Sequence, residues 1–114
     1  MKPRDYRDYV ADMVEAIGDI ESFIKGMTYE DFIADKKTRN AVIRSVEVIG
    51  EAAAKLPDEI RSKEPQMPWA RIVGMRNRLV HEYFGIDNQI LWKTVSESIP
   101  ELNNEVKRLL DALK

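Results

Sequence analysis

Apolar residues recur along the chain at helical spacing, and the pattern predicts five longer helices joined by short connections. The first stripe, within residues 5–25, consists of Tyr6, Tyr9, Val10, Met13, Ile17, Ile20 and Ile24. The second, within residues 37–56, consists of Val42, Val46, Ile49, Ala53 and Leu56. A third helix is predicted from about Pro68 to Tyr83 or Phe84. The fourth, over 88–97, carries Ile90, Leu91 and Val95, and the last buries Ile99, Leu102, Val106, Leu109 and Leu113.

Residues typical of helix ends stand between these stripes. Gly26 predicts the end of the first helix, and Thr28 with Asp31 predicts an N-cap for a short turn that reaches Ile33. Gly85 predicts the end of the third helix. Further signals are a proline that opens a short helix over 58–62, an aspartate that caps the fourth helix, and a capping box before the last helix: Pro57, Asp87, and Ser98 with Glu101.

No stretch alternates at the period of a strand, so the sequence predicts an all-α, up-and-down helical bundle. A length of 114 residues fits one domain over 1–114. Several helices have wide apolar faces for so small a protein. These faces favour a homodimer, although the pattern is also consistent with a monomer.

Composition limits the chemistry that is available. The chain has no cysteine and one histidine, which makes a poor transition-metal site, and it has no glycine-rich phosphate loop. We therefore expect no metal and no cofactor. No signal peptide and no apolar run of membrane-spanning length is visible, so the expected location is the cytoplasm, away from membranes.

Charge is unevenly distributed, although the net charge is only -2. Residues 1–35 hold four Lys/Arg and nine Asp/Glu, whereas residues 36–80 hold ten Lys/Arg and five Asp/Glu. The basic middle of the chain could meet phosphates, or its cations could simply lie on solvated helix faces.

Arg76 is an anomaly on the third predicted helix. At about 100° per residue, it lies about 20° from Trp69, in the middle of the apolar face. An arginine there needs a buried ion pair, for which Glu47 or Glu51 is a candidate, or it faces an opening where an anion binds. The pattern alone does not decide between these two readings.

His81 is the only histidine, and it lies about 40° from Asn77 at the edge of that face. Ala70 and Gly74 share this edge, and their small side chains predict a shallow gap beside Asn77 and His81. A partly buried histidine without a catalytic role would fit the same pattern. Arg76 and His81 point in different directions, but the long arginine stem, or a second copy of the helix in a dimer, could bring the two together.

The run from Arg76 to Tyr83, Arg-Asn-Arg-Leu-Val-His-Glu-Tyr, resembles the Arg-x4-His-x-Tyr motif of the HepT-like branch of the HEPN superfamily. The flanking segments resemble the same family in order, over about residues 38–103: Ile49-Gly50-Glu51-Ala52-Ala53, Leu56-Pro57, Pro68-Trp69, Gly74-Met75, Ile86-Asp87 and Trp92.

This resemblance implies a helical homodimer whose members are metal-independent ribonucleases, often toxins, with a minimal nucleotidyltransferase as the antitoxin. It implies that Arg76 and His81 are the catalytic pair and that Asn77 supports them. It implies further that Tyr83 is the tyrosine to which the antitoxin attaches AMP. The alternative is a non-catalytic helical adaptor that dimerises and binds a nucleotidyltransferase or a nucleotide, which would need neither a free His81 nor RNA.

Overall fold

The computed structural model describes residues 4–81 and 87–113, and within residues 76–81 it describes the backbone. In these residues the chain is helical without strands, which confirms the predicted all-α bundle. None of the described helices is long and apolar enough to cross a membrane.

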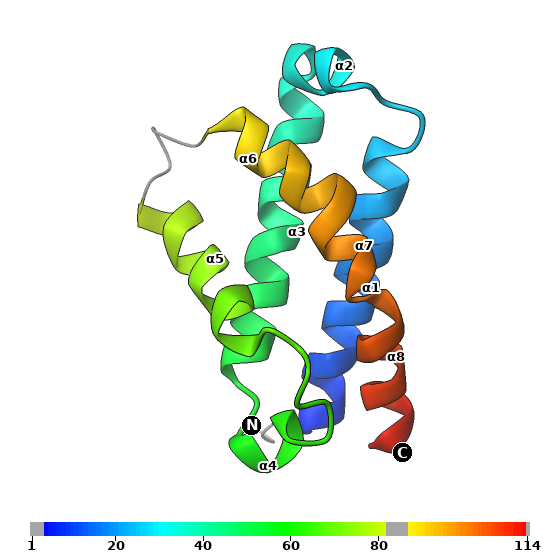
Figure 1. Cartoon of the computed structure of the whole chain (residues 1–114), viewed down its shortest axis with the longest axis vertical. Helices are drawn as coiled ribbons and strands as arrows, with labels where there is room; N and C mark the ends of the chain where they lie inside the picture. Colours follow the sequence, from blue (N-terminus) through cyan, green and yellow to red (C-terminus); the bar gives the residue numbers. More distant parts are fainter. Residues whose placement is uncertain (1–3, 82–86, 114) are drawn as a thin grey trace.

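Three long helices form the frame of the bundle (Figure 1). α3 (Lys36–Ala54) lies between α1 (Tyr6–Ile24) and α5 (Trp69–His81) and packs against both. The short helices α2 (Tyr29–Ala34) and α4 (Asp58–Arg61) lie in the connections before and after α3. The C-terminal part consists of α6 (Asn88–Lys93), the π-helical η2 (Thr94–Ser98), α7 (Ile99–Glu101) and α8 (Asn103–Ala112), of which α8 packs against α1.

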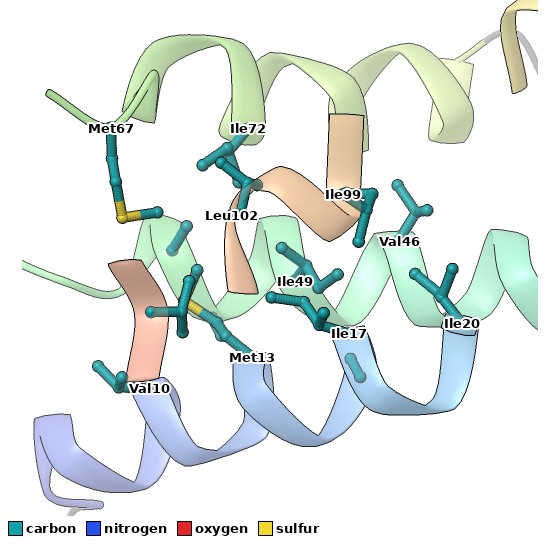
Figure 2. Packing of buried hydrophobic residues seen from close by; sticks show 14 of the residues in the cluster. Val10, Met13, Ile17, Ile20, Val46, Ile49, Met67, Ile72, Ile99 and Leu102 are labelled. Atoms are coloured by element: carbon teal, nitrogen blue, oxygen red, sulfur yellow. The ribbon is translucent and has the colours of Figure 1, made fainter. Parts of the chain in front are cut away.

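The core contains most of the predicted stripes. Figure 2 shows side chains of α1, α3, α5 and α7 meeting in one cluster, with Ile17, Ile49, Ile72 and Ile99 among them. All five residues of the stripe predicted within residues 37–56 are buried, and the last of them, Leu56, lies just beyond the end of α3 at Ala54. The stripe in α1 is narrower than predicted, because Tyr6 is 43% exposed. In α6, Ile90 belongs to the predicted apolar stripe but is 49% exposed.

Local capping explains where several helices begin. Thr28 accepts a hydrogen bond from the backbone N–H of Asp31, whose carboxylate accepts one from the N–H of Thr28, as the capping box predicts. Asp35 caps α3 through the backbone N–H of Thr38 at 3.0 Å and the Thr38 hydroxyl at 2.8 Å. These bonds to the ionised carboxylate lower the pKa of Asp35. Gly26 has a φ of 77°, which confirms it as the stop after α1.

The capping box predicted at Ser98 and Glu101 is wrong. Ser98 has helical dihedral angles, and its side chain caps no backbone N–H. The chain stays helical from α6 through η2 into α7, where the N–H of Ile99 donates to the carbonyl of Thr94. Pro100 has no N–H to offer the carbonyl of Ser96, and its ring would crowd that carbonyl in a regular α-turn. The wider π-helical turn before Pro100 relieves this conflict.

The predicted end of the third helix near Gly85 lies outside the described residues, since the described part of α5 stops at His81.

Candidate functional site

The candidate site belongs to the C-terminal half of α5, where the structure places the backbone of Arg76, Asn77 and His81 on one helix. Tyr83 lies outside the described residues, as do the contacts of the other three side chains. The convergence of Arg76 and His81 in one cleft therefore stays a prediction from the motif.

Contacts at the start of α5 fix its register on α3. The Nη2 of Arg61 donates to the carbonyl of Ala53 at 2.9 Å, and the Arg61 guanidinium lies 5.9 Å from the centre of the Trp69 ring. The start of α5 therefore lies beside the end of α3, and Figure 1 shows that the two helices run in opposite directions. Arg76 is seven residues further on, about 10 Å along the axis, and thus beside the middle of α3, near Val46.

Trp69 anchors α5 to the preceding loop. Its Nε1 lies 3.2 Å from the carbonyl oxygen of Arg61 and 3.1 Å from that of Glu64. Glu64 is buried, and its Oε1 accepts a hydrogen bond from the Nε of Arg108 at 3.1 Å. This contact spans 44 residues and ties the loop to α8. No periodicity or motif in the sequence indicates it, so sequence reasoning missed both Glu64 and Arg108.

Replacing Trp69 with Phe should remove the donor shared by two carbonyl oxygens. We expect Trp69→Phe to lower the free energy of unfolding by about 0.5–1.5 kcal/mol, the net worth of a typical hydrogen bond, because each carbonyl oxygen keeps a backbone donor, the N–H of Glu64 or of Met67. Urea denaturation followed by circular dichroism measures this loss. Trp92→Phe on α6 is the control for a smaller aromatic ring, and an equal loss in both variants would contradict a specific role for the Trp69 hydrogen bonds.

The carboxylates named as possible partners of Arg76 have another cation beside them. Arg44 lies 3.4 Å from Glu47 and 3.9 Å from Glu51, on the exposed side of α3. The Glu51 side chain is 45% exposed, whereas that of Glu47 is 23% exposed. These ion pairs give both carboxylates a role that is independent of Arg76, but they do not test the buried pair.

The edge of α5 that leads to Asn77 and His81 is open at Gly74. A Cβ added to Gly74 would meet none of the described side chains or neighbouring elements within 4 Å, and the preceding small residue on this edge, Ala70, is exposed. This space lies on the edge where the sequence predicts a shallow gap, and the gap beside the side chains of Asn77 and His81 stays a prediction. On the apolar side, Trp69 and Ile72 are buried, as the wheel predicts.

No described group of three or more His, Cys, Asp or Glu side chains could hold a metal ion. The described residues show two features of α5: one edge, with small residues, is open, and another face packs against α3.

The protein is thus an α-helical bundle in which one helix carries an arginine and a histidine five residues apart, as a candidate polar site. The comparison with known proteins narrows this class. The ribonuclease HepT-like family profile matches residues 13–109, which include Arg76, Asn77, His81 and Tyr83. The chain therefore belongs to the ribonuclease HepT-like family.

Three of the relatives match over almost their whole length. A protein of Thermococcus cleftensis named as a probable ribonuclease HepT is 45% identical over 106 residues, which cover 93% of this chain and 96% of the relative. A protein of Caldanaerobacter subterraneus subsp. tengcongensis named as a candidate RNase is 43% identical over 112 residues, 98% of this chain and 97% of the relative. Another so named, from Methanocaldococcus jannaschii, is 42% identical over 110 residues, 96% of this chain and 91% of the relative. No solved structure matches the chain with significance.

Proposed function

We propose that this protein is a metal-independent endoribonuclease that cleaves RNA with Arg76 and His81. The observation that carries the proposal is the family match over residues 13–109, which includes the whole Arg-x4-His-x-Tyr motif. The placement of the motif backbone on one helix, beside an open edge at Gly74, supports it.

RNA supplies its own nucleophile for this reaction. The 2′-oxygen attacks the adjacent phosphorus, a bond from phosphorus to the 2′-oxygen forms, and the bond to the 5′-oxygen breaks. The 2′-hydroxyl loses a proton and the leaving 5′-oxygen gains one, which gives a 2′,3′-cyclic phosphate and a 5′-hydroxyl. His81 exchanges a proton with one of these oxygens, since imidazole titrates near neutral pH. Arg76 stabilises the charge that grows on the non-bridging phosphate oxygens, and Asn77 supports the bound phosphate.

Incubation of the purified protein with RNA in the presence of EDTA tests this proposal. We expect internal cleavage, products that end in a 2′,3′-cyclic phosphate, and no cleavage of a substrate with 2′-O-methyl groups. Complete inhibition by EDTA, with activity restored by a divalent cation, would contradict metal independence. The absence of any cleavage or growth arrest, with intact binding of a nucleotidyltransferase, would favour the non-catalytic adaptor instead.

We further propose that the protein acts as the toxin of a toxin–antitoxin pair and that it works as a homodimer. In this scheme a minimal nucleotidyltransferase neutralises it by adding AMP to Tyr83. Four large apolar side chains of the described residues, Tyr6, Phe23, Ile33 and Ile90, are exposed and available to a dimer contact. Light scattering at micromolar concentration should give twice the monomer mass, and a monomer would contradict the homodimer.

Two substitutions of Gly74 distinguish an effect on stability from an effect on RNA cleavage. Gly74→Ala should raise the free energy of unfolding by up to about 1 kcal/mol, because alanine favours a helix and its methyl group fits the open space. Gly74→Leu should keep the fold but reduce RNA cleavage, since its side chain fills the edge beside Asn77 and His81. Thermal unfolding and a cleavage assay on the same samples measure the two effects. Full activity of folded Gly74→Leu would show that RNA does not use this edge.

A further inference from the structure

A groove of about 230 Å³ lies between the N-terminal half of α5 and the C-terminal helices. On the helical wheel its residues Arg71 and Met75 lie about 80° and 120° from His81, so the groove occupies a different side of α5 from the Asn77–His81 edge. The groove is lined by Gln66, Met67, Pro68, Arg71, Ile72, Met75, Ser98, Ile99, Glu101, Leu102 and Glu105.

The floor of the groove is apolar and its rim is charged. Met67, Ile72, Ile99 and Leu102 are core residues that close the floor. Around them, two carboxylates face one guanidinium: Glu101, Glu105 and Arg71. The groove therefore combines apolar contact with an excess of negative charge, a setting that suits an apolar side chain next to a cation and repels an anionic phosphate chain.

Glu105 is the carboxylate of this rim that comes from α8. Its Oε2 is buried and has no hydrogen-bond partner in the described part of the chain. Its Oε1 is 4.0 Å from the Nη2 of Arg108, whose Nε is already bound to Glu64. Because Oε2 is shielded from solvent, a ligand in the groove would reach Glu105 at the exposed part of its side chain, which is 27% exposed.

We propose that this groove binds a segment of a partner protein in which an apolar side chain stands next to arginine or lysine. The apolar side chain lies on Met67, Ile72 and Leu102, and the cation donates to Glu105 and Glu101. The segment contacts α5 up to Met75, directly before Arg76, without covering the Asn77–His81 edge. The groove is thus a docking site on the motif helix, and the proposal does not depend on RNA cleavage.

Titration of the isotope-labelled protein with acetyl-Leu-Arg-Leu-amide, followed by amide NMR signals, tests the proposal. We expect saturable shifts at Ile72, Met75, Ile99 and Leu102, and no such shifts with acetyl-Leu-Glu-Leu-amide. The absence of saturable shifts with the basic peptide, or an equal response to the acidic one, would overturn the proposal.

Variants identify the groups that bind. The double variant Glu101→Gln, Glu105→Gln should weaken binding of the basic peptide about fivefold, since two exposed ion pairs are lost. Glu97→Gln, an exposed carboxylate on η2 that does not line the groove, is the matched control and should change nothing.

Ser98→Trp should fill the groove and abolish binding, and thermal unfolding shows whether each variant is folded. An equal loss in Glu97→Gln would overturn the proposal. So would an oligomer that dissociates on Ser98→Trp without peptide, because a second copy of the chain would then occupy the groove.

Discussion

His81→Ala is expected to reduce the rate of RNA cleavage about 10²- to 10⁴-fold, the usual contribution of a positioned general acid or base. His81 is the only histidine of the chain, so no other imidazole can take over proton transfer. Arg76→Ala should cost about 10²–10³-fold in kcat, because it removes charge stabilisation that grows in the transition state. Single-turnover cleavage of a defined RNA at saturating protein separates this loss from weaker binding.

Arg78→Ala is the matched control for Arg76→Ala. Arg78 is also on α5, but the helical wheel places it about 160° from Arg76. It should keep most of the activity and change only the salt dependence of RNA binding. Equal losses for Arg76→Ala and Arg78→Ala would mean that the helix contributes general positive charge and no specific site. Full activity of folded His81→Ala would rule out the catalytic pair.

Local signals in the sequence were sufficient for much of the fold. Capping by Thr28 and Asp31, the stop at Gly26 and the stripe around Ile49 each depend on residues within a few positions of one another. Such features follow from backbone hydrogen bonds that must be satisfied locally.

Features that depend on distant contacts were not predictable. The segment around Ser98 carries a capping-box pattern, but packing keeps it helical, with a π-turn ahead of Pro100. The contact of Glu64 with Arg108 depends on how α8 folds back over the loop before α5. The groove beside Met75 likewise exists only because two remote segments meet.

The candidate site also combines features that depend on local sequence with features that depend on distant contacts. The motif predicts Arg76 and His81 as the site because both lie on one helix at a fixed spacing, and the open space at Gly74 follows from a missing side chain. The convergence of Arg76 and His81 depends on their side-chain conformations and, in a dimer, on a second copy of the helix. The spacing of the two residues along one chain determines neither. The proposed pair is therefore best tested by the non-additivity of Arg76→Ala and His81→Ala, since residues that act as one unit lose little more together than singly.

Tyr83→Phe is expected to abolish modification by a cognate nucleotidyltransferase while RNA cleavage continues. Tyr83 is two residues beyond His81, so a group attached to its hydroxyl would be close to the motif. AMP brings bulk and a negatively charged phosphate. We expect that phosphate to bind the guanidinium of Arg76 in place of the RNA phosphate, so that modification would block substrate by both charge and volume.

Co-expression with the nucleotidyltransferase and intact-mass measurement test this mechanism. The wild-type protein should gain AMP-sized mass increments and lose ribonuclease activity, whereas Tyr83→Phe should gain none and stay active and toxic to the cell. Tyr29→Phe, in which α2 loses the same hydroxyl, is the matched control and should be modified like the wild type. Mass increments that persist in Tyr83→Phe would place the modification on another residue. Neutralisation of Tyr83→Phe without any added mass would show that the partner inhibits by binding alone, which the groove between α5 and the C-terminal helices could provide.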